Sequence, residues 1–277
     1  MLKKILRYVG CGLCLFCIIS LFACAGSDGS QKTDPGPSPT PTIQDIDPAT
    51  VLPLRMPQLE PLVPGEELVV LHTSMGDIKL RMFPEGAPKA VENFLTHARA
   101  GYYDGVIFHR VIEDFMIQGG DPTGTGMGGE SIWGGGFAYE FALNLRHFRG
   151  ALAMAHSSLP DSNGSQFYIV QNHNLYSEYK TDFEEMLEYQ DTIISVTEDG
   201  IPIFGKQMFP ESAIREYVDN GGTPHLDLLF NEDGHTVFGH VVEGMDVVDA
   251  IAAVAKDNNG KPLKDVVIER VSFEIAP

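Results

Sequence analysis

Short apolar runs separated by glycine-containing turns recur along the chain from residue 66 to its end. Each run has the length, about four to eight residues, and the apolar, β-branched composition that are typical of strands. Strands are predicted at 68–73, 77–83, 106–112, 115–118, 151–155, 166–170, 236–241 and 266–275. Many short strands with glycine-rich turns are typical of sheets that close into a barrel and so leave no edge strand exposed. The pattern therefore indicates a mainly β protein built as a closed barrel.

Two segments depart from the strand pattern and are predicted as helices that cap the barrel. In the first, 87–100, apolar residues from Val91 to Ala98 recur at spacings of three and four, as on one face of a helix. Pro88 falls in its first turn and Gly101 follows its end, and this is the order that helix termini favour. The second predicted helix covers 246–254.

The segment 176–222 interrupts the barrel pattern and is predicted as a partly helical insertion. We expect helices at 178–189 and 210–220, with an Asp199-Gly200 turn between them. An insertion of this length with structure of its own is typical of a functional or partner-facing loop. A tolerated surface excursion is the other interpretation, and the sequence leaves both open.

The first 23 residues have the pattern of a bacterial lipoprotein signal peptide. Lys3, Lys4 and Arg7 precede an apolar run at 9–22 that is short for a membrane-spanning helix. The run ends in Leu-Phe-Ala before Cys24, which resembles a lipobox, so we expect cleavage before Cys24 and lipid attachment to its thiol. An uncleaved signal anchor is the alternative. Both interpretations place the remaining chain outside the cytoplasmic membrane, anchored to the bacterial cell membrane.

Residues 24–65 are predicted as a linker that joins the lipidated Cys24 to a domain at 66–277. The prolines between Asp34 and Thr42 disfavour helix and sheet, because proline lacks an N–H donor and fixes φ. All four cysteines lie at or before residue 24. We therefore expect no disulfide framework in the domain.

Two motifs carry the strongest functional signal. The first, Phe108–Asp121, reads Phe-His-Arg-Val-Ile-Glu-Asp-Phe-Met-Ile-Gln-Gly-Gly-Asp, and the second, Ser162–Ile169, reads Ser-Asn-Gly-Ser-Gln-Phe-Tyr-Ile. Together they resemble the signature segments of the cyclophilins, a family of peptidyl-prolyl cis/trans isomerases. The resemblance covers about residues 68–275 outside the insertion. It implies a closed eight-stranded antiparallel β-barrel capped by two α-helices.

The chemistry of this family needs no bond to be broken. Rotation about an Xaa–Pro bond crosses a barrier of roughly 18–20 kcal/mol, because the twisted amide loses its resonance. A donor aimed at the proline nitrogen, or at the proline's own carbonyl, stabilises the twisted state more than the planar one. The resemblance assigns this catalytic role to Arg110, whose guanidinium is permanently charged and presents its donors in a rigid plane.

The resemblance also assigns residues to the substrate-binding walls of a groove. Two glutamines would hydrogen-bond the substrate backbone, and an apolar pit would hold the proline ring. The residues predicted to bind substrate are Phe115, Met116, Gln118, Ala155, His156, Gln166, Tyr168, Leu226 and His235.

Three positions depart from the usual residues of the family. Tyr168 stands in place of a phenylalanine, so its hydroxyl needs water or a polar partner. His156 stands in place of an asparagine, and His225 in place of a tryptophan that contacts cyclosporin. These departures leave the catalytic assignment intact and argue against cyclosporin sensitivity.

Other patterns do not support a competing chemistry. The glycines from Gly124 to Gly129 match a dinucleotide fingerprint, but no helix follows them. The nine histidines include no His-Glu-x-x-His pair. A net charge of −19, from 19 basic and 38 acidic residues, argues against a nucleic-acid partner. We expect no metal and no cofactor, and we expect a monomer.

The sequence thus predicts an isomerase that accelerates Xaa–Pro rotation during the folding of exported proteins, with proline-containing polypeptides as its partners. A proline-peptide binding module or chaperone with little turnover is one alternative. A surface scaffold that acts through the insertion is another, and its partner binding would survive loss of Arg110. The presence of Arg110 favours the enzyme.

Overall fold

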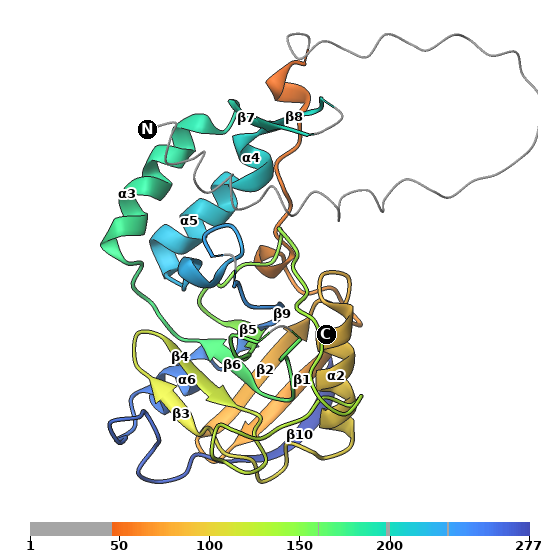
Figure 1. Cartoon of the computed structure of the whole chain (residues 1–277), viewed down its shortest axis with the longest axis vertical. Helices are drawn as coiled ribbons and strands as arrows, with labels where there is room; N and C mark the ends of the chain where they lie inside the picture. Colours follow the sequence, from red (N-terminus) through yellow and green to blue (C-terminus); the bar gives the residue numbers. More distant parts are fainter. Residues whose placement is uncertain (1–45, 160, 198–199, 232) are drawn as a thin grey trace, which may run out of the picture.

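The computed structural model describes residues 46–159, 161–197, 200–231 and 233–277 (Figure 1). Its main element is an eight-stranded sheet with the order β10-β1-β2-β9-β5-β6-β4-β3, in which all neighbouring strands are antiparallel. The strands are β1 (Glu67–Thr73), β2 (Gly76–Met82), β3 (Arg110–Ile112), β4 (Met116–Gly119), β5 (Ala151–Met154), β6 (Phe167–Val170), β9 (Val237–Glu243) and β10 (Ile268–Ile275).

The sheet curls into a half-barrel and does not close fully. Its outer strands, β3 and β10, approach each other at an isolated bridge between Ile107 and Val267. Further along β3, the N–H of Val111 donates to the carbonyl of Gly260 over 2.7 Å. The segments that precede β3 and β10 are thus hydrogen-bonded to each other, whereas β3 and β10 themselves are not paired. The eight antiparallel strands are confirmed, and the predicted full closure is corrected to a half-barrel.

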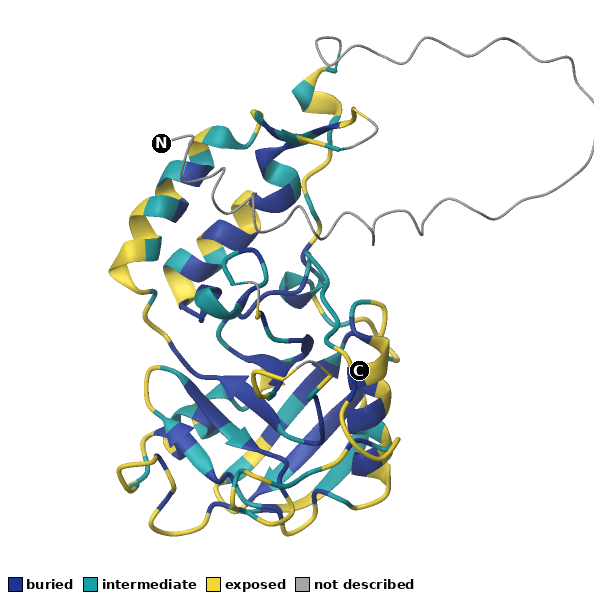
Figure 2. Cartoon of the chain, viewed as in Figure 1, coloured by how far each residue is buried: buried dark blue, intermediate teal, exposed yellow. Residues whose placement is uncertain are grey.

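Two helices cap the half-barrel, which confirms the predicted helices. α2 (Pro88–Arg99) contacts β9 and β10, whereas α6 (Met245–Ala252) contacts β2, β3 and β4. Pro88 is the first residue of α2, where its missing N–H costs no helical hydrogen bond. The apolar face of α2 is buried and its opposite face is exposed (Figure 2).

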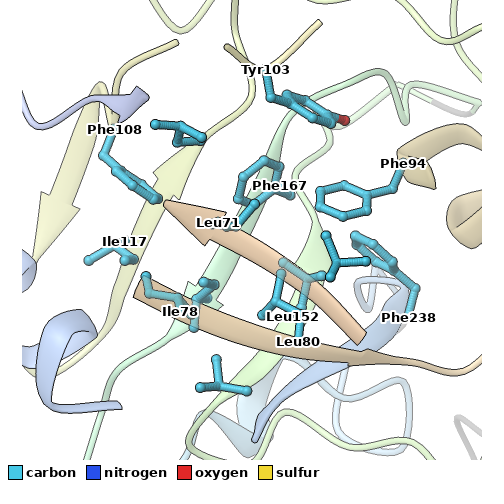
Figure 3. Packing of buried hydrophobic residues seen from close by; sticks show 14 of the residues in the cluster. Leu71, Ile78, Leu80, Phe94, Tyr103, Phe108, Ile117, Leu152, Phe167 and Phe238 are labelled. Carbon is cyan, nitrogen blue, oxygen red and sulfur yellow. The ribbon is translucent and has the colours of Figure 1, made fainter. Parts of the chain in front are cut away.

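The core between the sheet and α2 is apolar and rich in aromatic rings (Figure 3). The ring centroid of Phe94 on α2 lies 5.4 Å from those of Phe167 and Phe238. The ring of Phe167 meets that of Tyr103 edge-on, with centroids 5.5 Å apart. Such edge contacts are the favoured geometry for aromatic pairs, so this core holds β6 and β9 rigidly beneath the groove described below.

The insertion forms its own group of elements beside the half-barrel (Figure 1). It contains α3 (Ser177–Met186), β7 (Ile193–Val196), β8 (Pro202–Phe204), α4 (Gly205–Met208) and α5 (Glu211–Asn220). α3 and α5 confirm the two predicted helices, but the β7–β8 hairpin and α4 were not predicted. Asp199 of the expected turn lies outside the described residues.

The described residues before β1 pack against both the half-barrel and the insertion, although 24–65 is predicted as a linker. Met56 is buried in an apolar cluster with residues of α3 and α5. Gln58 donates to the Arg146 carbonyl over 2.9 Å and accepts from the Arg146 N–H over 2.7 Å. Two 3-10 helices, η4 (Pro48–Thr50) and η5 (Pro57–Leu59), shape this segment.

The predicted signal peptide at 1–23, Cys24 and the proline-rich part of the linker all lie outside the described residues. Within the part of the chain that the structure describes, no helix combines the length and the apolar character that crossing a membrane requires.

Candidate active site

An open groove of about 320 Å³ gathers nine of the ten residues predicted for catalysis and substrate binding. The tenth, Gln166, contacts the groove residue Gln118. The nine lining residues are Arg110, Phe115, Met116, Gln118, Ala155, His156, Tyr168, Leu226 and His235. The fold therefore brings together side chains that are far apart in the sequence.

A chain of hydrogen bonds orients the guanidinium of Arg110 in the groove. Nη1 of Arg110 donates to Oε1 of Gln118 over 3.3 Å, and Nε2 of Gln118 donates to Oε1 of Gln166 over 2.9 Å. Nε2 of Gln166 in turn donates to the carbonyls of Gly126 and Gly128, over 3.1 Å and 2.7 Å. Arg110 pairs with Gln118 across β3 and β4, so the register of the sheet places the two side chains together.

The loop that supplies these two carbonyls is organised by Asp121. Its carboxylate is fully buried and accepts hydrogen bonds from the N–H groups of Thr123, Thr125, Gly126 and Gly128. Burial alone raises the pKa of Asp121, but these donors outweigh it and hold the pKa well below its usual range. This role of Asp121 was not predicted. An aspartate followed by threonines and glycines is the local signal that could have found it.

The apolar pit lies between two strands and the segment after the insertion. Met116 on β4 and Tyr168 on β6 are buried, and Phe115 and Leu226 are half-buried beside them. Leu226 ends the 3-10 helix η7 (Pro224–Leu226). Ala155 packs against the same cluster and leaves room where a larger side chain would fill the groove. The pit has the apolar lining that a proline ring requires.

The hydroxyl of Tyr168 has no hydrogen-bond partner among the described residues, and the side chain is 4% exposed. Burial, with a smaller contribution from the charge of Asp227, raises the pKa of this phenol well above its usual value. Tyr168 thus keeps its proton at neutral pH. The ring of Tyr168 lines the pit, whereas its hydroxyl is a buried polar group without a partner among the described residues.

Two histidines close the remaining wall. The ring centroids of His156 and His235 lie 3.9 Å apart, and Nδ1 of His235 lies 3.1 Å from the Met154 carbonyl. Burial, together with the nearby His156 and His147, lowers the pKa of His235 to about 3. His235 is therefore neutral at physiological pH, and Nδ1 carries the proton because its partner can only accept.

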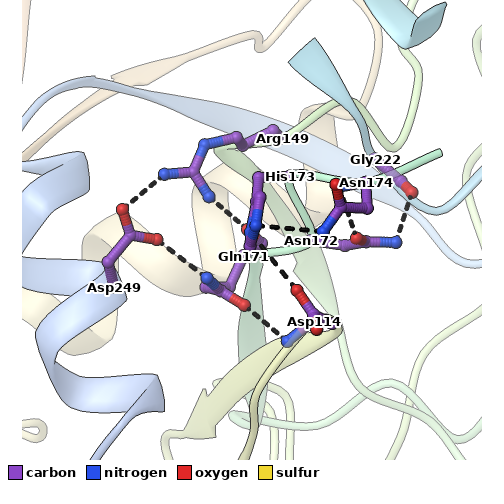
Figure 4. Close-up of polar contacts among 8 residues, drawn as sticks. All are labelled: Asp114, Arg149, Gln171, Asn172, His173, Asn174, Gly222 and Asp249. Carbon is purple, nitrogen blue, oxygen red and sulfur yellow. Dashed lines mark hydrogen bonds and ion pairs between the residues drawn. The ribbon is translucent and has the colours of Figure 1, made fainter.

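A polar network that includes Asp114, Gln171 and Asp249 (Figure 4) adjoins Phe115, which lines the pit. The carbonyl of Phe115 accepts from the N–H groups of Gln171 and Asn172, over 2.9 Å and 3.2 Å. The side chain of Gln171 accepts from the N–H of Asp114 over 2.8 Å and donates to Asp249 of α6 over 2.8 Å. The loop before β4 is thereby fixed to β6 and α6. No local pattern indicates this long-range network.

No group of three or more histidine, cysteine, aspartate or glutamate side chains suited to a metal ion is found among the described residues. Several buried ring nitrogens have no hydrogen-bond partner among the described residues, including both nitrogens of His109 and Nε2 of His147. The polar side chains that line the groove are those of Arg110, Gln118, His156, Tyr168 and His235.

The half-barrel and its groove define a class of protein. The family model for cyclophilin type peptidyl-prolyl cis-trans isomerases matches residues 68–273. The chain belongs to this family, which confirms the resemblance seen in the two motifs.

Individual relatives agree with the family assignment. A Staphylococcus aureus protein named for peptidyl-prolyl cis-trans isomerase activity is 48% identical over 210 residues, which are 76% of this chain and 93% of the relative. A Staphylococcus haemolyticus protein with the same name is 46% identical over 219 residues, 79% of this chain and 97% of the relative.

A solved structure is also similar. The crystal structure of a Cryptosporidium parvum cyclophilin type isomerase, determined in the presence of the dipeptide Ala-Pro, has a TM-score of 0.54 and 29% identity. The match covers 76% of this chain and 99% of that chain. The enzyme class is thus a cyclophilin-type peptidyl-prolyl cis-trans isomerase.

Proposed function

We propose that this protein accelerates rotation about Xaa–Pro bonds of exported polypeptides, with Arg110 as the catalytic residue. We also propose that lipid attached to Cys24 holds the protein outside the cytoplasmic membrane. The observation that carries the proposal is the placement of Arg110 beside an apolar pit in one groove. Membership of the isomerase family supports the reaction. The sequence pattern before Cys24 supports the location.

Arg110 supplies the interaction that changes between the ground state and the transition state. As the C–N bond twists, the proline nitrogen becomes pyramidal and gains a lone pair that a guanidinium N–H can meet. One N–H of Arg110 is committed to Gln118, which sets the plane of the guanidinium and leaves its other donors for the substrate. Orienting the cation in advance avoids reorganisation during the rotation.

The pit supplies the fixed point about which the peptide turns. Burial of the proline ring against Met116, Phe115 and Leu226 holds one side of the Xaa–Pro bond while the other side rotates. Gln118 and Gln166 are already bonded to each other and to the glycine-rich loop, so the polar wall is rigid before a substrate arrives. No group has to gain or lose a proton at any step.

A proline-isomerisation assay on a short Xaa–Pro peptide, with wild-type full chain, tests the reaction. We expect acceleration of the cis-to-trans exchange. Binding of the peptide without acceleration would favour the proline-peptide binding module.

Labelling of the protein with a fatty acid in a bacterial host tests the location. We expect label on the wild type and no label on Cys24→Ala. Label retained by Cys24→Ala would overturn the lipid anchor.

A further inference from the structure

The insertion is fastened at both ends beside the groove. At its end, Nδ2 of Asn172 donates to the carbonyl of Gly222 over 3.0 Å (Figure 4), and the N–H of Thr223 donates to the carbonyl of His147 over 2.8 Å. Gly222 has φ +130, and a Cβ there would lie 2.5 Å from the His147 carbonyl. Only glycine allows the backbone at 222 to lie this close to the His147 carbonyl. The segments that enter and leave the insertion are therefore held next to each other at the half-barrel.

A buried carboxylate ties the insertion to the wall of the pit. Asp227 is 3% exposed and accepts from the N–H and from Nδ1 of His147, each over 2.8 Å. Its other oxygen accepts from the hydroxyl of Tyr217 on α5. Because Asp227 directly follows Leu226, these bonds fix the pit wall to the inserted helix.

The first residue of the insertion extends this wall with an aromatic surface. The rings of Phe115 and His225 are stacked, with centroids 5.9 Å apart and an interplanar angle of 23°. The ring of Tyr176 lies 5.7 Å from that of His225 and is 40% exposed. Phe115 also lines the groove, so the row of three rings extends outward from the edge of the pit.

The middle ring of this surface is uncharged at neutral pH. Burial, with the nearby His147, lowers the pKa of His225. A neutral imidazole between a phenylalanine and a tyrosine offers an aromatic face that accepts apolar or aromatic side chains. Tyr176 reaches it from the backbone turn that starts α3, where its carbonyl accepts from the N–H groups of Tyr179 and Lys180. That turn depends on the backbone of Tyr176, so its ring can be changed without loss of the turn.

We propose that Phe115, His225 and Tyr176 form a subsite for an aromatic side chain next to the substrate proline, and that Tyr176 is a specificity-determining residue. The proposal rests on the proposed function of the groove. It gives the insertion a role in substrate choice, because the insertion supplies Tyr176 directly and holds His225 through Asp227. A ring contact of this kind changes kcat/KM by about fivefold between an aromatic side chain and none.

The test compares four peptides that carry Phe or Gly immediately before or immediately after the proline. We expect wild-type full chain to prefer Phe at one of these two positions. Tyr176→Ala should reduce the Phe-to-Gly ratio of kcat/KM there by about fivefold, whereas Tyr176→Phe should keep it. The matched control is Ile201→Ala, an insertion residue that is 59% exposed and lies between β7 and β8, which should leave the ratio unchanged.

Two results would overturn the subsite. One is a wild type that accelerates Phe and Gly peptides equally at both positions, and the other is an unchanged ratio in Tyr176→Ala. A wild type that accelerates none of the four peptides contradicts the proposed function itself, so the two failures are distinguishable. Thermal unfolding of each variant separates a change in selectivity from loss of the fold.

Discussion

Nε2 of Gln118 donates to Oε1 of Gln166 over 2.9 Å, and this bond joins the catalytic wall of the groove to the glycine-rich loop. Gln118 also accepts from Arg110, and Gln166 also donates to two loop carbonyls. The position of the guanidinium therefore depends on a loop that is ordered by Asp121.

Removal of Gln166 should disconnect the arginine from this loop. We expect Gln166→Ala to lower kcat/KM by about tenfold, because one oriented interaction with the transition state is weakened. Gln190→Ala is a matched control, since Nε2 of Gln190 also bonds two backbone carbonyls, those of Met186 and Phe209 in the insertion. It should keep the wild-type kcat/KM, and equal losses in both variants would argue that Gln166 acts only through stability.

Replacement of Tyr168 by phenylalanine should stabilise the protein. The hydroxyl is buried and unpaired among the described residues, and an unsatisfied buried polar group costs about 1–3 kcal/mol. We expect Tyr168→Phe to raise the free energy of unfolding in urea by about 1 kcal/mol and to keep catalysis. A loss of stability of this size would mean that the hydroxyl has a partner, such as a bound water.

The neutral state of His235 makes stability depend on pH. Its folded pKa of about 3 lies below the value of about 6.5 in an unfolded chain, so the unfolded state binds more protons between these pH values. The contribution of His235 is complete above about pH 6.5 and is lost as the pH falls toward 3.

Unfolding in urea at pH 7 and pH 5 measures this dependence. We expect His235→Gln to lose less stability than wild type between the two pH values, by about 1–2 kcal/mol. The control Ile201→Ala, which removes no titratable group from an exposed position, should follow wild type. Identical pH dependence in all three proteins would contradict the burial of a neutral His235.

The rate of isomerisation should be nearly flat from about pH 6 to 8, since Arg110 stays charged and the pKa of His235 lies well below this range. The profile of kcat/KM on one peptide measures it. A bell-shaped profile within this range would indicate a titrating acid or base that the mechanism lacks.

The eight strands could be predicted because their signals are local, and most of the groove could be predicted because its motifs resemble those of the cyclophilins. The motif from Phe108 to Asp121 contains a strand, a turn and a second strand, so β3–β4 pairing places Arg110 opposite Gln118 without further information. α2 could be predicted from the spacing of its apolar residues and from Pro88 in its first turn. These features depend on neighbours in the sequence.

The remaining features depend on contacts between distant segments. The strands of the β7–β8 hairpin are short, and no local pattern indicated that they pair. Two contacts join the insertion to the groove: the hydrogen bond from Tyr217 to Asp227 and the ring contact of Tyr176 with His225. Neither contact can be predicted from the residue types alone. Whether the barrel closes depends on pairing between β3 and β10, which lie more than 150 residues apart in the sequence and do not pair in the structure.

The most direct test of the central claim is the isomerisation rate of Arg110→Ala on a model Xaa–Pro peptide. We expect kcat/KM to fall by about 100-fold, as for the loss of one oriented donor to a transition state. Arg110→Lys should recover only part of this loss, because a lysine lacks the planar array of donors that meets Gln118 and the substrate together. A variant Arg110→Ala that folds and keeps the full wild-type rate would contradict the assignment of Arg110 as the catalytic residue.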